Sequence, residues 1–220
     1  MPRNVKRFDA AAMAAAGKKP GWKRREGAEV ITNDQLGATV LHVVVCNDDA
    51  ILWDQILRCE IGGGVFLPVD DQQRIGLQKQ WRPQTKDQAA WKAEYPNIDV
   101  SKLGRDSWEI PRGFAKVGET GADAAVREAQ EETESVVVAS TVLGDVCDNT
   151  ALSPHMTAIQ IGKIDPSKKP KDKPDVNEKM LAPLTFFTLK EIKQMVARGE
   201  IYDAYTLAAL GLYYIDQHGN

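Results

Sequence analysis

Cysteine is scarce in this chain of 220 residues, which contains only three. Cys46, Cys59 and Cys147 are scattered and odd in number, which argues against a disulfide framework and for reduced thiols in a cytoplasmic setting. None of them lies in a paired spacing such as Cys-x-x-Cys, which argues against a zinc site. With 43% apolar residues, the chain is expected to form one domain around a real core, with an appendage.

Strong net charge and long apolar runs are also missing. The formal net charge is −3, so no strong overall field favours nucleic acid or an anionic membrane as a partner. No stretch approaches the length that is needed to span a membrane. The apolar segment Ala10–Ala16 is short, follows Asp9 and leads into Lys18-Lys19-Pro20, so we do not interpret it as a signal peptide.

Composition divides the chain into three parts. Residues 1–26 carry eight Lys and Arg residues against Asp9 and Glu26, and we expect a flexible basic arm without a strand. This arm is either a solubilising terminus or a tail that contacts phosphate or nucleic acid, and its few aromatic residues favour the first. Residues 27–61 are expected to hold N-terminal strands, and residues 62–220 are expected to form the main domain.

Short β-branched or alternating runs predict eight strands after residue 38. They are Thr39–Val45, Ile51–Glu60, Gly64–Val69, Arg74–Lys79, Ser107–Ile110, Val136–Leu143, Thr157–Ile164 and Leu184–Phe187. The polar segment Gln84–Arg105 between two of these strands is expected to be a long irregular excursion, and such loops are often functional.

Capping signals predict three helices. Thr120 with Asp123 predicts a capping box for a helix that ends near Thr133, and Thr188 with Glu191 predicts another for a helix that Gly199 ends. A last amphipathic helix is expected over about Asp203–Asp216. Mixed strands with few helices in this order predict an α+β fold, an α/β/α sandwich around a mixed sheet.

The segment from Gly113 to Ser135, GFAKVGETGADAAVREAQEETES, is the most informative part of the chain. Glu119 follows the glycine by six residues, and Arg127 follows Glu119 by eight. Three carboxylates at spacing i, i+3 and i+4 then fall on one stripe of a helix, namely Glu128, Glu131 and Glu132. Like charges this close repel each other, and a hard cation such as Mg²⁺ would relieve the repulsion. The alternative, a solvated acidic helix face, does not explain the glycine, the spaced glutamate or the arginine.

This segment resembles the signature of the Nudix hydrolases, which is Gly, five residues, Glu, seven residues, then Arg-Glu-apolar-x-Glu-Glu-x-Gly-apolar. The matching residues are Gly113, Glu119, Arg127, Glu128, Ala129, Glu131 and Glu132. Glu134 stands where the family has a glycine, and Ser135 stands where it has an apolar residue. Because that glycine lets the chain turn out of the helix, the glutamate affects the expected helix exit more than the metal site.

The resemblance implies a Mg²⁺ site, for which Mn²⁺ is a substitute. Its expected ligands are the carboxylates of Glu128 and Glu132 and the backbone carbonyl of Arg112. Glu131 is expected to serve either as a third ligand or to orient Arg127. Such a cation neutralises pyrophosphate oxygens and lowers the pKa of a bound water.

Two further roles follow from the resemblance. Arg127 is expected to pair with Glu119 or Glu131, either as a structural ion pair or in contact with substrate as part of the catalytic set. The general base of relatives of the ADP-ribose pyrophosphatase type is a glutamate on a mobile loop after the motif. Glu178 is the candidate here, and Asp175 is the alternative.

Three other segments resemble the branch that acts on ADP-ribose and nucleotide sugars. They are Gln80-Trp81-Arg82-Pro83, Trp108-Glu109-Ile110-Pro111-Arg112-Gly113 and Leu152-Ser153-Pro154. The substrate contacts that the resemblance implies are Arg82, Trp81, Glu109 and Pro154. Arg82 would contact a phosphate or sugar and Trp81 would stack on a base. A strand-end ion pair for Arg82 and a core position for Trp81 remain open as structural alternatives.

The sequence therefore predicts a Mg²⁺-dependent Nudix hydrolase that cleaves the pyrophosphate of nucleoside diphosphate sugars, ADP-ribose first. One alternative is a Nudix pyrophosphatase for dinucleotides or damaged nucleotides, and another is a nucleotide-sugar sensor without catalysis. In this branch, N-terminal antiparallel strands often form an arm that swaps onto a second subunit. We therefore expect the strands in residues 27–61 to form a dimerisation arm of a homodimer.

Overall fold

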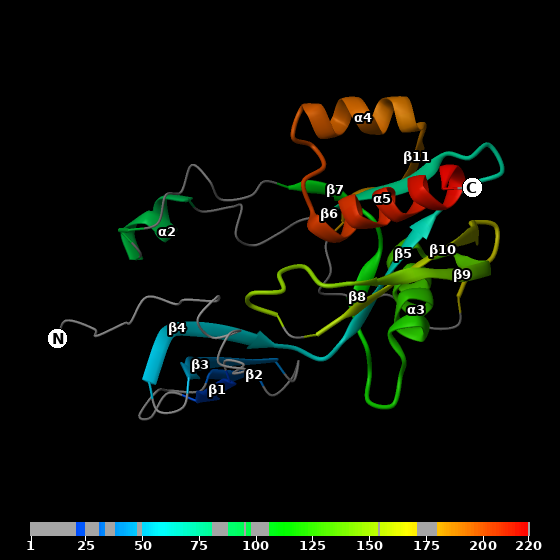
Figure 1. Cartoon of the computed structure of the whole chain (residues 1–220). Helices are drawn as coiled ribbons and strands as arrows, with labels where there is room; N and C mark the ends of the chain where they lie inside the picture. The colour runs from blue at the N-terminus through cyan, green and yellow to red at the C-terminus, as the bar shows by residue number, and fades with distance from the viewer. Residues whose placement is uncertain are drawn as a thin grey trace. The chain divides into compact units, whose positions relative to one another are not determined.

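The structure is a computed structural model that describes residues 21–24, 31–33, 38–47, 50–80, 88–94, 96–97, 106–153, 155–170 and 180–219. The chain divides into two compact units (Figure 1). The first contains Met1–Ile61 together with Cys147–His155, and the second contains Gly62–Val146 and Met156–Asn220. Within the described residues, no helix is long and apolar enough to cross a membrane.

The first unit is built on an antiparallel sheet. Its strands are β1 (Gly21–Arg24), β2 (Ile31–Asn33), β3 (Ala38–Asn47) and β4 (Ala50–Cys59). β3 pairs with each of the other three strands. The predictions for β3 and β4 are confirmed, whereas the expectation that the basic arm lacks a strand is wrong at β1. The sequence of β1, Gly-Trp-Lys-Arg, has no alternating apolar signal, and its strand conformation depends on pairing with β3.

The segment Cys147–His155 belongs to this first unit because it is bonded to β4. The backbone N–H of Arg58 donates to the carbonyl of Leu152 at 2.7 Å, and the Arg58 guanidinium forms an ion pair with Asp148. Glu60 accepts from Arg58 Nε at 2.9 Å, and its other oxygen lies 3.5 Å from His155 Nε2. Cys59 and Cys147 are not joined in a disulfide, as the sequence predicted for the cysteines.

The described residues of the second unit form two sheets and four helices. The mixed sheet has the order β8-β5-β10-β9, in which β5 and β10 are parallel and the other pairs antiparallel. The second sheet is antiparallel, with the order β11-β6-β7. The elements are β5 (Gly63–Pro68), β6 (Ile75–Gln80), α2 (Gln88–Glu94), β7 (Ser107–Glu109), β8 (Arg112–Phe114), α3 (Gly121–Thr133), β9 (Val136–Val146), β10 (Thr157–Asp165), β11 (Met180–Phe187), α4 (Leu189–Ala197) and α5 (Ala204–His218).

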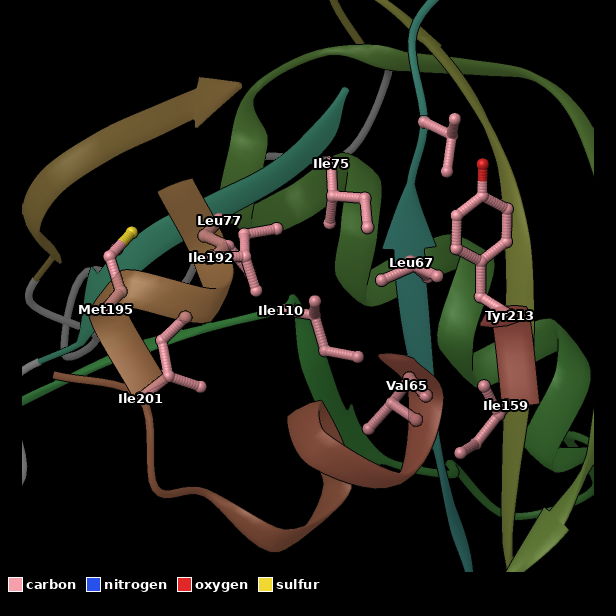
Figure 2. Close-up of a cluster of buried hydrophobic side chains, with 12 residues drawn as sticks. Val65, Leu67, Ile75, Leu77, Ile110, Ile159, Ile192, Met195, Ile201 and Tyr213 are labelled. Carbon is pink, nitrogen blue, oxygen red and sulfur yellow. The ribbon is translucent and has the colours of Figure 1, made fainter. Parts of the chain in front are cut away.

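β5 lies at the centre of this unit and is buried on both faces. Successive side chains of a strand point to opposite faces, so Val65 and Leu67 share one face and Phe66 lies on the other. Val65 and Leu67 pack in the main core with residues of β6, α4 and α5, as Figure 2 shows. Phe66 packs against Ala125 and Ala129 of α3. Helices therefore cover both faces, which confirms the expected α+β fold with a mixed sheet.

The predicted helix caps are confirmed. The side chain of Thr120 accepts from the backbone N–H of Asp123, whose carboxylate bonds back to the cap, and Thr188 with Glu191 repeats this arrangement for α4. The side chain of Asp203 caps α5 by accepting from the backbone N–H of Thr206. Gly199 follows α4 with a left-handed φ of 69°. These caps are local in sequence, which explains why pattern alone located the three helices.

Two elements in the second unit differ from the sequence interpretation. α2 (Gln88–Glu94) forms inside the segment that was expected to be irregular, and its residues Gln-Ala-Ala-Trp-Lys-Ala-Glu include several good helix formers. At seven residues it is too short to give a clear amphipathic pattern. β8 (Arg112–Phe114) was not predicted, because its three residues become a strand through antiparallel pairing with β5.

Glu134 ends α3 in a left-handed conformation, with φ 49° and ψ 36°. This is the position at which the sequence signature has a glycine. A residue with a Cβ is strained in this region, whereas glycine adopts it freely. The chain therefore leaves the helix in the left-handed conformation that the glycine of the signature would adopt, but a glutamate at this position destabilises the folded state.

Glu134→Gly is expected to stabilise the protein by about 0.5–1 kcal/mol, because the relief of left-handed strain exceeds the added freedom of the unfolded chain. The melting temperature should rise by about 1–4 °C in a thermal unfolding experiment. Lys169, whose Nζ lies 3.4 Å from Glu134 Oε2, provides the control. Both side chains are mostly exposed, so Lys169→Ala should have little effect. A fall in melting temperature for Glu134→Gly would contradict this account.

Candidate active site

The close approach of α3 to β5 positions the acidic helix. A Cβ at Gly64 would overlap the carbonyl oxygen of Gly121 and the backbone of Ala125, so only glycine allows this packing. The side chain of Gln160 on β10 also donates to the carbonyl of Ala122 at 2.9 Å. The first turn of α3 is thus fixed to two central strands of the mixed sheet.

Arg127 joins three carboxylates and one backbone carbonyl. Its Nε and Nη2 donate to the two oxygens of Glu119 at 2.9 and 3.0 Å. Its Nη1 donates to Glu128 at 2.6 Å and to Glu131 at 2.8 Å. Its Nη2 also donates to the carbonyl of Phe114 at 2.8 Å. The expected pairing with Glu119 or Glu131 is therefore present with both, and it fastens the loop after β8 to α3.

The charge balance in this cluster is reflected in two pKa shifts. Hydrogen bonds from Arg127 lower the pKa of Glu119 below its ordinary value, although burial opposes them. Burial alone would lower the pKa of Arg127, but its bonds to the three carboxylates raise it overall. The guanidinium and Glu119 are therefore both charged at neutral pH, and Glu119 is held as a structural partner of the arginine.

Glu128 lies directly over Gly113. A Cβ at Gly113 would overlap the carboxylate of Glu128, which gives the physical reason for the leading glycine of the motif. Glu128 is buried at 9% exposure, and burial raises the pKa of its carboxyl above the ordinary value even though Arg127 opposes the shift. An ionised carboxylate at this position is poorly solvated and would gain from a cation.

Glu132 accepts hydrogen bonds from donors other than Arg127. Gln78 Nε2 on β6 donates to its Oε2, and Gln80 Nε2 donates to its Oε1 at 3.3 Å. The backbone N–H of Arg112 also donates to Oε2 at 3.3 Å. The sequence analysis did not identify either glutamine as a contact of the acidic helix, although their spacing of two residues places them on one face of β6.

Arg112, which was selected only for its backbone carbonyl, has a defined side chain. Its Nη2 lies 3.2 Å from Glu109 Oε2, and its Nη1 lies 3.0 Å from Asp203 Oδ1. The guanidinium carbon is 5.3 Å from the centre of the Tyr205 ring. Glu109 is almost fully buried, so this ion pair joins β7 and β8 to the start of α5.

The residues fit the divalent cation that the resemblance implies. Glu128, Glu131 and Glu132 offer only oxygen atoms, the donors that Mg²⁺ and Mn²⁺ favour. Gln78 Oε1 is buried without a hydrogen-bond partner among the described residues, which is consistent with a ligand that is still to be added. No group of three or more His, Cys, Asp or Glu side chains in the described part of the chain is already arranged as a cation site.

The structure brings some of the predicted residues together and leaves others outside its description. Glu128, Glu131, Arg127 and Glu119 form one cluster of direct ion pairs. Glu132 is linked to Arg112 through the backbone bond described above. Trp81, Arg82, Pro154, Asp175 and Glu178 lie outside the described residues.

Comparison with known proteins identifies the family. Residues 61–210 match the Nudix domain family. No curated protein sequence is significantly similar to the chain. A crystal structure of an ADP compounds hydrolase has a TM-score of 0.62 and 15% sequence identity, and the similarity covers 92% of this chain and 97% of that chain. At this identity the likeness shows the shared fold. Because the family match spans more than half of the chain and includes the glycine, arginine and carboxylates described above, the chain belongs to the Nudix family of pyrophosphohydrolases.

Proposed function

We propose that this protein hydrolyses the pyrophosphate bond of nucleoside diphosphate sugars, with ADP-ribose as the first candidate, in a Mg²⁺-dependent reaction. Water adds to one phosphorus and the P–O–P bridge breaks, which gives a nucleoside monophosphate and a sugar phosphate. The observation that carries the proposal is the set of contacts on α3. Glu128 and Glu132, one helical turn apart, are held by separate donors, Arg127 on one side and Gln78 on the other.

In this proposal, Glu128 and Glu132 bind the cation together with the backbone carbonyl of Arg112. When bound, the cation neutralises pyrophosphate oxygens and lowers the pKa of a water molecule. Arg127 keeps Glu128 and Glu131 in place through bonds of 2.6 and 2.8 Å. Glu131 is the third ligand or orients Arg127.

The substrate contacts are proposed from the same resemblance. Arg82 contacts a phosphate or the terminal sugar, Trp81 stacks on the base, and Pro154 is a further substrate contact. Glu109 is only 2% exposed and paired with Arg112, so we propose that it acts by orienting that arginine beside the substrate. ADP-ribose is favoured because these segments resemble that branch, and because the similar fold described above is that of an ADP compounds hydrolase.

The general base is proposed to be Glu178. Glu178→Gln should lower kcat about 10²–10⁴-fold with little change in KM, because ground-state binding does not depend on proton transfer. Steady-state kinetics on ADP-ribose with saturating Mg²⁺ measures both constants. Asp175→Asn is the matched comparison. If it reduces kcat while Glu178→Gln stays within about threefold of the parent, the role belongs to Asp175.

Assembly and location complete the proposal. We infer a homodimer in which residues 27–61 form the arm, since β3 and β4 build a sheet whose edges need cover. Sedimentation of the full chain should give twice the mass of one chain, and a monomer that is fully active would rule the dimer out.

The three scattered cysteines favour the cytoplasm, and the net charge of −3 argues against nucleic acid as a partner.

The direct test is a substrate panel. The protein is incubated with Mg²⁺ and ADP-ribose, GDP-mannose, UDP-glucose, dinucleotides or nucleoside triphosphates, and the products are identified by chromatography. Release of AMP and ribose 5-phosphate at the highest rate supports the proposal. Preference for dinucleotides or damaged nucleotides supports the other Nudix pyrophosphatase function. Binding of nucleotide sugars without turnover supports a sensor.

A further inference from the structure

Gln78 is a fully buried polar residue on β6, the strand that also supplies Ile75 and Leu77 to the main core. It lies on β6 opposite Glu109 of β7 and has 0% exposure. Its neighbour Leu77 points to the other face of the strand and packs in the main core (Figure 2). A buried glutamine costs free energy unless its amide is hydrogen-bonded, so this position requires an explanation.

Only the nitrogen of the Gln78 amide has a hydrogen-bond partner among the described residues. Nε2 donates to Glu132 Oε2, while Oε1 has no hydrogen-bond partner among the described residues. Leaving a buried carbonyl oxygen without a donor costs about 1–3 kcal/mol, and a methionine of the same length would avoid that cost. The position is therefore poorly suited to stability alone, and the side-chain bond that Gln78 makes among the described residues is to a proposed cation ligand.

Two other donors among the described residues also contact Glu132. Gln80 Nε2 and the Arg112 backbone N–H both lie 3.3 Å from the carboxylate, at the outer limit for N–H donors. A hydrogen bond to an ionised carboxylate is about twice as strong as a neutral one, and it fixes the orientation of the group. Gln78 thus supplies a further donor to this carboxylate.

We propose that Gln78 is a positioning residue that holds Glu132 in the orientation for cation binding. This inference rests on the proposed function, since it assumes that Glu132 binds a divalent cation. Groups that orient metal ligands typically change metal affinity about 10–100-fold when they are removed. Gln78 was not part of any motif in the sequence, and Glu132 is the only side chain through which it acts on the site among the described residues.

The test measures Mn²⁺ affinity by isothermal titration, without substrate, for the parent chain and for Gln78→Met. We expect the variant to bind Mn²⁺ about 10–100-fold more weakly. Tyr213→Phe is the control, because it removes a side-chain hydrogen bond from a buried residue, the bond to Gln73 Oε1, on α5 and away from the carboxylates. It should bind Mn²⁺ like the parent. Gln78→Asn, whose amide is one methylene shorter, replaces Gln78→Met if that variant does not fold.

A double-mutant cycle separates positioning from a general structural effect. If Gln78 acts through Glu132, adding Gln78→Met to Glu132→Gln should change Mn²⁺ affinity by less than about twofold. Equal affinity in Gln78→Met and the parent, or full additivity in the cycle, overturns the role of Gln78 alone. Absence of saturable Mn²⁺ binding in the parent instead contradicts the proposed function, and this inference with it.

Discussion

Glu128→Gln is expected to lower turnover of ADP-ribose about 10²–10⁴-fold while the fold remains intact. A neutral amide keeps the hydrogen bond from Arg127 but cannot replace an anionic ligand for a hard cation. Glu132→Gln should behave in the same way. Steady-state kinetics with saturating Mg²⁺ measures the effect, and Glu200→Gln, which changes an exposed carboxylate outside the site, serves as the control.

Glu128→Gln is expected to leave the stability of the protein equal or higher when no divalent cation is present. Burial raises the pKa of Glu128, so the folded state binds its proton more tightly than the unfolded state does. Its contribution to stability is therefore present below the unfolded pKa and is lost as pH rises through the folded pKa. At neutral pH the buried, ionised carboxylate destabilises the folded state, and the uncharged glutamine side chain removes this destabilisation. Near-parent turnover in both variants would contradict the proposed site.

Arg127→Met is expected to destabilise the protein by about 3–5 kcal/mol, because it removes the guanidinium that three largely buried carboxylates share. For a chain of this size, this corresponds to a fall in melting temperature of about 6–20 °C. Thermal unfolding at pH 7 measures the effect. Arg198→Met is the matched control, because the ion pair of Arg198 with Glu200 is exposed and should contribute little.

The pH dependence of stability provides a second test of the role of Arg127. Arg127 lowers the pKa of Glu119 below its ordinary value of 4.5, so this stabilisation is present above pH 4.5 and is lost as pH falls through the folded pKa. The difference between the parent and Arg127→Met should therefore shrink in acid. If Arg127→Met loses no more stability than Arg198→Met at pH 7, the arginine does not organise the cluster.

The sequence predicted those features that depend on local chemistry or on a spaced motif. The capping boxes at Thr120 and Thr188 involve residues three positions apart, and both are present. The motif also indicated that Arg127 pairs with Glu119 or Glu131, because i, i+4 neighbours meet on a helix and the loop glutamate has a fixed spacing.

Features that depend on long-range packing were not predicted. Gln78 looks like any polar residue of a short strand, and its bond to Glu132 joins residues 54 positions apart. The side chain of Arg112 reaches Asp203 across an even longer separation in sequence. β1 has a basic, non-alternating sequence that becomes a strand only beside β3. The proposed base Glu178 lies outside the described residues, so it remains a prediction from the resemblance.

The most direct test of the central claim is a ³¹P NMR time course of ADP-ribose hydrolysis. With Mg²⁺, the two diphosphate signals should be replaced by two phosphomonoester signals, those of AMP and ribose 5-phosphate. Addition of EDTA, or use of the Glu128→Gln variant, should stop this conversion. Diphosphate signals that persist with the parent protein and Mg²⁺, or that disappear equally fast in EDTA, would contradict a cation-dependent pyrophosphohydrolase built on Glu128 and Glu132.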